Sequence, residues 1–277
     1  MIDETPLIFN RALYLARQKK ASGTEVLQNH IAAELDERLS LIMRRLPQAL
    51  VITQNSQITV DSLKVSGKFD EVIQIEPSAN DAVTLPEQHY DCIISLLDLQ
   101  CVNDVPGHLS QLGRSLKADG LLLVAFFAGD TLHELRQAWL DAELEISGGV
   151  SPRVAPMIGV RELGGLMQRA GLALPVADID HTIVRYADVF ALMREIKASG
   201  YANPLVGRMS KFVSRRFLTK MAEDYHTNYT DDDGRIRATL EVAWAMAWKP
   251  HESQQKPLKP GSAKQSLADV LKHKSNK

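Results

Sequence analysis

The sequence has little cysteine and no long apolar run, and each shortage excludes a class of protein. Its 277 residues include only two cysteines, Cys92 and Cys101. Two cysteines cannot form the disulfide framework of a small secreted domain, and they fit a reducing compartment. No apolar run has the length of a membrane-spanning helix, and Asp3 and Glu4 argue against a transit peptide. We therefore expect a cytoplasmic globular protein.

Motifs that mark several common enzyme classes are also missing. The chain has no Gly-x-Ser-x-Gly elbow, no Walker loop and no zinc-type cysteine pairs. His89 and Asp91 have the spacing of two iron ligands, but Asp91 begins a predicted strand and no third ligand is marked. No metal site is therefore predicted. A net charge of −2 gives no reason to expect nucleic-acid binding.

Charge is unevenly distributed along the chain. Residues 249–277 hold seven lysines and two acids, a net +5, which leaves −7 for the rest. We expect residues 251–277 to form an irregular basic tail that contacts an acidic partner, or one that only aids solubility. Residues 1–46 are expected to form an N-terminal helical segment, and residues 47–250 an α/β domain.

Residues 90–129 contain the clearest structural pattern. Two short apolar runs, 92–97 and 121–127, predict strands buried on both faces. Leucines spaced three and four apart predict a helix between them, with Pro106 in its first turn and Gly120 in the turn that follows. A strand, a helix and a second strand make a right-handed βαβ unit, and parallel sheets bind ligands at the carboxyl ends of their strands.

The other predicted elements complete a doubly wound, Rossmann-like sheet. Thr24 is expected to cap the helix that follows it, and Thr131 to Glu134 matches a capping box. About forty residues separate the first strand from Asp91, which is too few for two further βα units and predicts a shortened first half. Periodicity predicts helices over 7–20, 24–46, 131–142, 163–170, 189–196 and 209–221, and strands over 49–52, 69–75, 179–186 and 240–248.

A basic helix is expected from Arg208 to Lys220. Its five cations share a helix with an apolar opposite face. Such a helix can lie on a membrane surface or bind an acidic peptide, or it can simply present a solvated face over a core stripe. Peripheral contact with the inner membrane is therefore one expectation.

Several ordered strings along the chain are typical of one family. They lie at residues 102–106, 116–120, 129–132, 134–136, 148–153, 168–171, 233–235, 251–254 and 260–263. On these strings the chain resembles the methyltransferase-like assembly factors of respiratory complex I (NADH dehydrogenase), within the class I S-adenosylmethionine-dependent methyltransferase superfamily. The resemblance is dense over residues 90–270 and looser over 7–52.

The resemblance implies a class I methyltransferase fold and a role in maturing NADH dehydrogenase. The mitochondrial member of the family hydroxylates an arginine of a complex I subunit, so the implied partner is a protein subunit. The implied cofactor is S-adenosylmethionine. Fold alone does not fix the reaction.

The cofactor loop departs from the family pattern, Pro-x-Ala-Leu-Asp-Leu-Gly-Cys-Gly-x-Gly. Val51 replaces the acid, and Thr53, Asn55 and Gln57 replace the three glycines. Glycine lets the backbone approach the cofactor and take positive φ, which a β-branched threonine does poorly. These changes argue against ordinary cofactor binding. Glu76 follows a strand and can serve as the acid that binds the ribose, or it is an exposed loop residue.

Candidate site residues gather at the carboxyl ends of the central strands. Ser95 and Leu97 end one strand, where the family lines its pocket. Asn103, Asp104, Gly129, Asp130 and Arg136 follow, with Arg153 on a nearby loop. The two carboxylates suit an arginine of a client protein. Alternatively, Asp130 helps to cap a helix and the two arginines form structural ion pairs.

Three functions therefore remain open from the sequence. The first is an assembly factor that modifies or holds an NADH dehydrogenase subunit. The second is a methyltransferase with an altered cofactor loop. The third is a non-catalytic scaffold. Loss of the cofactor glycines favours the scaffold over the methyltransferase.

Overall fold

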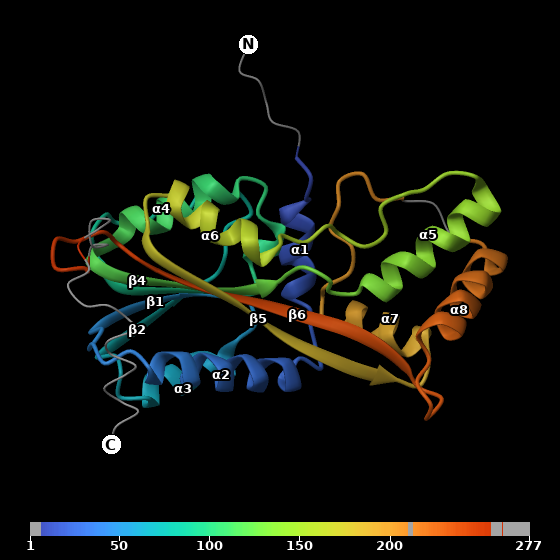
Figure 1. Ribbon diagram of the computed structural model, residues 1–277, viewed down its shortest axis with the longest axis horizontal. Helices are drawn as coiled ribbons and strands as arrows, with labels where there is room; N and C mark the ends of the chain where they lie inside the picture. The colour runs from blue at the N-terminus through green and yellow to red at the C-terminus, as the bar shows by residue number, and fades with distance from the viewer. Residues whose placement is uncertain (1–6, 210–212, 256–261, 263–277) are drawn as a thin grey trace, which may run out of the picture.

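The computed structural model describes residues 7–209, 213–255 and 262. The expected doubly wound sheet is present, with six strands in the order β2-β1-β3-β4-β6-β5 (Figure 1). Pairing from β2 to β4 is parallel, and β6 runs antiparallel to both β4 and β5. The strands are β1 (Gln48–Ile52), β2 (Glu71–Ile75), β3 (Tyr90–Leu96), β4 (Leu116–Phe127), β5 (Ala173–Tyr186) and β6 (Ile236–Trp248).

The predicted βαβ unit forms the centre of this sheet. β3 and β4 are parallel neighbours, and α4 (Val105–Ser115) connects them with Pro106 in its first turn. The expected turn at Gly120 is wrong, because β4 already begins at Leu116 and contains an irregular section there. Asp119 has a positive φ of 60° in that section.

The first half of the sheet is shortened, as predicted. β1 is followed by α3 (Gln57–Val65) and β2, and the fully described segment from Glu76 to His89 contains no strand. The sequence analysis missed α3, which buries only Thr59, Val60 and Leu63. So few apolar positions in nine residues give a weak periodic signal.

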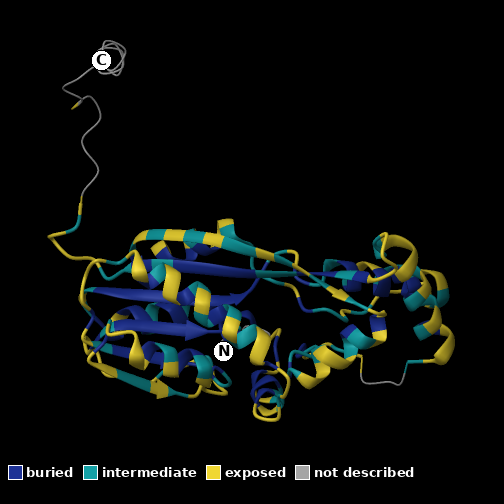
Figure 2. Cartoon of the chain, turned by 90° about the horizontal axis from the view of Figure 1, so that it is seen from below, coloured by how far each residue is buried: buried dark blue, intermediate teal, exposed yellow. Residues whose placement is uncertain are grey.

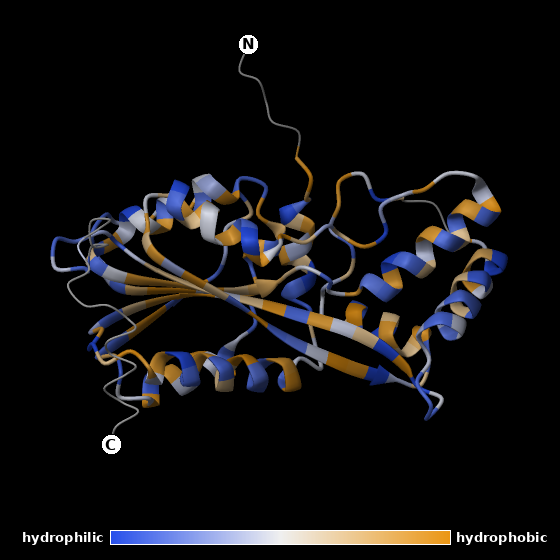
Figure 3. Ribbon diagram, in the orientation of Figure 1, coloured by the Kyte–Doolittle hydropathy of each residue, from blue (hydrophilic) through white to orange (hydrophobic). Residues whose placement is uncertain are grey.

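Helices cover both faces of the sheet. α4 and α6 (Val160–Arg169) pack on one face, and α2 (Glu25–Ser40) and α3 pack on the other (Figure 1). The predicted helix over 24–46 therefore ends early, although Leu46 is still buried. Thr24 does not cap α2; its Oγ1 accepts a hydrogen bond from the side chain of Gln28 at 2.7 Å. Most of β1, most of β3 and the section of β4 from Gly120 to Phe127 are buried and strongly apolar (Figures 2 and 3).

β5 and β6 extend beyond the rest of the sheet and carry a second helical cluster. Its helices are α5 (His133–Ser147), α7 (Val189–Ala198) and α8 (Arg215–Tyr229), at the right of Figure 1. Trp139, Phe217 and Tyr225 fill a core of their own between these helices. The short N-terminal helix α1 (Arg11–Gln18) lies between this cluster and the central sheet (Figure 1).

The predicted capping box at the start of α5 is wrong. Thr131 does not cap α5, because its Oγ1 donates to the carbonyl of Ala128 at 2.8 Å and accepts from the backbone N–H of Glu241 at 3.0 Å. Glu134 likewise accepts the N–H of Thr239, on β6, at 2.9 Å. Both members of the expected capping box therefore bind β6 instead of the helix.

The basic helix is also shorter than predicted. α8 begins at Arg215, with Ser214 Oγ accepting the N–H of Phe217 at 3.3 Å, and residues 210–212 lie outside the described residues. Arg208 belongs to the preceding loop and donates to the carbonyl of Leu205 at 3.0 Å. The predicted basic tail falls mostly on residues 256–261 and 263–277, which are likewise outside the description.

Candidate functional site

The loop after β1 has lost the geometry that the family's glycines allow. Val51 lies in the core with no exposed surface, and Thr53 is 1% exposed. The N–H of Thr53 donates to the carbonyl of Ile75 at 3.1 Å, which joins the loop to β2. No residue between Thr53 and Gln57 has a positive φ. The backbone therefore does not adopt the left-handed conformation that glycine would favour.

Helix α1 crosses the carboxyl ends of β1, β2 and β3. The side chain of Asn55, in the β1 loop, donates a hydrogen bond to the carbonyl of Gln18. Lys19 Nζ lies 2.8 Å from the carboxylate of Glu76, the residue expected to bind a ribose. The hydrogen bond and charge of Lys19 lower the pKa of Glu76. Two of the expected cofactor residues, Asn55 and Glu76, therefore bind the end of α1.

The deeper contacts of α1 are with the end of β3. Arg11 Nη2 lies 2.6 Å from Asp98 Oδ2, and these side chains are 3% and 0% exposed. Tyr14 donates its hydroxyl to the carbonyl of Leu97 at 2.5 Å. Leu97 has a φ of 54°, so strained backbone is stabilised by contact with the helix. Ser95 is also buried, and its hydroxyl has no partner among the described residues.

A small polar cavity remains beside these contacts. Its volume is about 240 Å³, and its lining includes Arg11, Glu76, Asp98 and His108. Arg11 Nη1, Asp98 Oδ1 and His108 Nε2 are buried without hydrogen-bond partners in the described part of the chain. Burial lowers the pKa of His108 and so keeps the imidazole neutral. Water or a small polar ligand fits such a lining.

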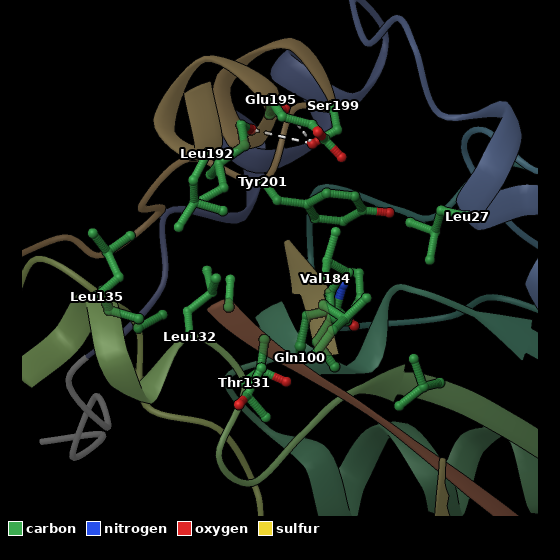
Figure 4. Close-up of a pocket in the computed structure, with 18 of the residues that line it drawn as sticks. Leu27, Gln100, Thr131, Leu132, Leu135, Val184, Leu192, Glu195, Ser199 and Tyr201 are labelled. Atoms are coloured by element: carbon green, nitrogen blue, oxygen red, sulfur yellow. Dashed lines mark hydrogen bonds between the residues drawn. The ribbon is translucent and has the colours of Figure 1, made fainter. Parts of the chain in front are cut away.

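A larger cavity, of about 680 Å³, is lined by Tyr14 from α1. Figure 4 shows part of its lining. Its walls come from α2, β4, α5, β5, α7 and β6, and they are mostly apolar. Leu132, Leu135 and Leu192 lie at one end, and Leu27 lies across from them (Figure 4). α1 therefore separates a small polar cavity from a large apolar one. Tyr14 lines the apolar cavity, and burial raises the pKa of its hydroxyl.

The predicted carboxylates lie at the ends of neighbouring strands. Asp104 is exposed, and its Oδ1 caps α4 by accepting the N–H of Gly107 at 2.9 Å. Asn103, beside it, accepts the N–H groups of Ile8 and Phe9 at 2.9 and 2.8 Å, which joins the N-terminal segment to β3. Asp130 is exposed and follows β4. Asp104 therefore has a capping role, and both carboxylates remain open to solvent.

Sequence reasoning missed Glu241, which organises the loop that contains Asp130. Glu241 Oε2 accepts the N–H of Asp130 at 2.8 Å. A Cβ placed on Gly129 would lie 2.1 Å from that oxygen, and Gly129 has a φ of 52°. Only glycine fits both conditions. The glycine before Asp130 was visible in the sequence, but Glu241 lies 111 positions beyond Asp130 and gave no signal.

The two predicted arginines differ in their surroundings. Arg153 is paired with Glu143 at 2.7 Å, and its guanidinium lies 4.7 Å from the ring centre of Trp139. This matches the alternative in which the arginine is structural. Burial raises the pKa of Glu143, but hydrogen bonds from Ser151 and Arg153 outweigh this effect and lower it. Within the described part of the chain, Arg136 Nη2 makes only long contacts, of 3.4 Å, to the carbonyls of Thr131 and Ala155.

The iron-like spacing of His89 and Asp91 does not lead to a ligand cluster. Asp91 Oδ2 accepts from Lys117 Nζ at 2.9 Å, and His89 packs edge-on against Tyr90. Across residues 7–209 and 213–255, no three or more His, Cys, Asp or Glu side chains are grouped as metal ligands would be. Over the same residues, none of the helices is both long enough and apolar enough to cross a membrane.

Comparison with known proteins places these features in a family. No protein-family model matches the chain. The mitochondrial arginine hydroxylase NDUFAF5 of Danio rerio is 32% identical over 90% of this chain and 73% of its own. The human NDUFAF5 is 31% identical over 96% of this chain and 84% of its own. A crystal structure of a protein assigned as a methyltransferase, from Bacillus halodurans, has a TM-score of 0.50 at 12% identity, and covers 79% of this chain and 98% of its own. The chain has a class I methyltransferase fold and belongs to the family of the arginine hydroxylase NDUFAF5.

Proposed function

We propose that this protein acts in the maturation of NADH dehydrogenase by holding a protein subunit, without using S-adenosylmethionine. Membership in the NDUFAF5 family supports a role in this maturation, since the NDUFAF5 relatives match almost the whole chain. The single observation that carries the mode of action is the position of α1. It occupies the strand ends where this fold binds its cofactor.

S-adenosylmethionine does not fit the residues at these strand ends. The cofactor's amino-acid end needs the acid and the glycines that Val51 and Thr53 replace, and its ribose needs the carboxylate that Lys19 binds. Arg11 and Asp98 form a buried ion pair next to this carboxylate in the small cavity. Moving α1 aside would leave buried charges without partners, which costs several kcal/mol.

A methyltransferase with an altered cofactor mode is the second candidate. The small polar cavity favours it, because about 240 Å³ remains beside Glu76 at the end of β2. Calorimetric titration with S-adenosylmethionine separates the two candidates. We expect no binding tighter than millimolar, and a micromolar constant, about 8 kcal/mol of binding free energy, would favour the methyltransferase.

The client surface we propose consists of Asp104 and Asp130. Both carboxylates are exposed at neighbouring strand ends, and a carboxylate suits the guanidinium of a client arginine. Arg136 lies near Asp130 and can assist, whereas Arg153 positions Glu143 and the loop that carries Ser151. A peripheral contact with the inner membrane, if made, would use Arg215 and Arg216, because Lys220 pairs with Glu145 at 2.7 Å.

Assembly of NADH dehydrogenase in the native cell tests this proposal. Deleting the gene should lower the amount of assembled enzyme on a native gel, and the wild-type chain should restore it. Asp104→Asn with Asp130→Asn keeps side-chain size and much of the capping ability at Asp104. We expect this double variant to fold normally by circular dichroism but to restore assembly poorly. Full restoration would remove the carboxylate surface from the proposal.

Asp61→Asn with Asp232→Asn is the matched control, because both of these carboxylates are exposed and neither belongs to the proposed client surface. Asp61 is an exposed residue of α3, and Asp232 lies in the exposed turn before β6. The control removes the same charge and should restore assembly fully. If it fails to the same degree, overall charge is the cause, and the position of Asp104 and Asp130 is not.

A further inference from the structure

The large apolar cavity has walls whose polar atoms are already paired. Thr131 Oγ1 donates to the carbonyl of Ala128 at 2.8 Å, and Ser199 Oγ donates to the carbonyl of Glu195 at 2.8 Å (Figure 4). His30 pairs with Asp180, and Thr239 Oγ1 donates to Glu134 at 2.6 Å. These groups gain little from a polar ligand, so the free surface of the cavity is its aliphatic and aromatic part.

Gln100 and the hydroxyl of Tyr201 are the exceptions, since no hydrogen bond joins that hydroxyl to another described residue. Gln100 is 6% exposed and lines the cavity (Figure 4), and its Nε2 donates to the carbonyl of Leu97 at 2.8 Å. Its Oε1 is buried and has no partner among the described residues. Both oxygens can accept from a hydroxyl or an amide N–H of a ligand.

The charged groups of the lining disfavour an anionic ligand. Asp180 and Glu195 contribute two carboxylates, whereas Arg153 is already paired with Glu143 at 2.7 Å. A carboxylate or phosphate head would thus meet an excess of negative charge. An extended peptide is disfavoured for another reason. Its backbone N–H and C=O groups would enter apolar walls that offer them almost no partners.

We propose that this cavity binds a long alkyl chain with an uncharged, hydrogen-bond-donating head, such as a fatty alcohol or a monoacylglycerol. The cavity of about 680 Å³ has the size of an ordinary small-molecule site. A methylene takes up roughly the volume of a water molecule, about 30 Å³, so the cavity has room for a chain of roughly 12 to 18 carbons. The chain lies against the leucines and Val184, and the head donates to Gln100. This inference concerns a different cavity from the cofactor cleft and does not depend on the function proposed above.

Binding of a neutral fluorescent hydrophobe, N-phenyl-1-naphthylamine, to the full chain tests the proposal. We expect saturable binding with a micromolar dissociation constant, and displacement by 1-dodecanol and by monododecanoylglycerol. Dodecanoate has the same chain length but a negative head, and it should displace the dye about tenfold less well. If both neutral ligands displace the dye, the cavity recognises neutral alkyl amphiphiles in general. If only one of them displaces it, that compound identifies the head group that the cavity prefers.

Two neighbouring residues of β5 provide a matched pair of variants. Val184 lines the cavity, whereas Ile183 is 50% exposed and is absent from the cavity lining (Figure 4). Val184→Trp fills part of the cavity and should weaken dye binding about tenfold or more. Ile183→Trp adds the same side chain outside the cavity and should leave binding unchanged. Circular dichroism and melting temperature check that both variants fold.

A second filling variant keeps the test decisive if Val184→Trp does not fold. Thr182 also lines the cavity from β5, and Thr182→Phe adds an aromatic ring that suits a strand. Equal dye binding by the wild type and by whichever filling variant folds would overturn the proposal. Dye binding that no neutral alkyl ligand displaces would also overturn it, and would leave the cavity to an apolar segment of a protein.

Discussion

The two cavities beside α1 differ in how the chain has used them. On the side of β1 and β2, where this fold binds its cofactor, Arg11 and its partners leave a polar space of about 240 Å³. On the side of β4, β5 and β6, an apolar space of about 680 Å³ remains open. The first side is occupied by the protein itself, and the second is not.

This difference separates the half of the fold that contacts α1 from the half that we propose binds a ligand. Four cofactor residues of the family are replaced in the β1 loop, and Asn55 of that loop binds the carbonyl of Gln18 in α1. The opposite half still contains an unfilled apolar cavity, which destabilises a folded protein unless something fills it.

Removing Arg11 should have the largest effect on stability, because it disrupts the contacts between α1 and the ends of β1, β2 and β3. Arg11→Met leaves Asp98, which has no exposed side-chain surface, buried without its cation. We expect the free energy of unfolding to fall by about 3 to 5 kcal/mol, measured by urea denaturation at pH 7. The double variant Arg11→Met with Asp98→Leu should recover most of the loss. A single variant as stable as the wild type would show that the pair is not buried in solution.

Truncating a side chain that lines the large apolar cavity should lower the free energy of unfolding by less. Leu192 is 2% exposed and lines the large cavity, whereas Leu112 on α4 is fully buried and lies away from it. We expect Leu192→Ala to lower the free energy of unfolding by about 2 kcal/mol, and Leu112→Ala by about 3 to 5 kcal/mol. Because Leu192 borders the cavity, it has fewer packing contacts than Leu112, and its truncation therefore removes less packing energy. Equal losses in urea denaturation would mean that the cavity collapses in solution.

The sheet was predictable from the sequence because its signal is local. The runs 92–97 and 121–127 and the alternation over 240–248 gave β3, β4 and β6, since each strand is buried along its own length. The shortened first half followed from counting residues before Asp91. The helix starts at Thr131 and Met209 were wrong. Thr131 and Glu134 had the right spacing for a cap, but β6 binds them more favourably.

The site was less predictable because its partners are distant in sequence. The loss of the family's cofactor residues at Val51 and Thr53 was readable, but the docking of α1 over these strand ends was not. Arg11 pairs with Asp98 across 87 positions, and Tyr14 contacts Leu97 across 83. Periodicity describes which side of α1 is apolar and cannot show where that side docks.

The polar cavity should also make stability depend on pH, which the apolar cavity should not. Burial lowers the pKa of His108 from its ordinary value of 6.5. Above that value the imidazole is neutral in both states. As the pH falls from about 7 towards 5, the unfolded chain binds the proton first, so stability decreases. His108→Gln should reduce this decrease in urea denaturation at several pH values. His251→Gln, at an exposed position, should leave it unchanged.

The smallest expected effect on stability comes from the hydroxyl of Tyr14, which lies between the two cavities. Tyr14→Phe removes the hydrogen bond to the carbonyl of Leu97, which still accepts from Gln100 at 2.8 Å. We expect a loss of about 1 kcal/mol, and a similar loss for Tyr225→Phe, whose hydroxyl donates to the carbonyl of Arg237 at 2.8 Å. Trypsin should distinguish them, because Arg11, Arg17 and Lys19 are cleavage sites in and beside α1. Tyr14→Phe should speed cleavage there, since it loosens the helix from β3, whereas Tyr225→Phe should not. Equal cleavage rates would mean that the ion pair of Arg11, and not Tyr14, keeps α1 over the strand ends.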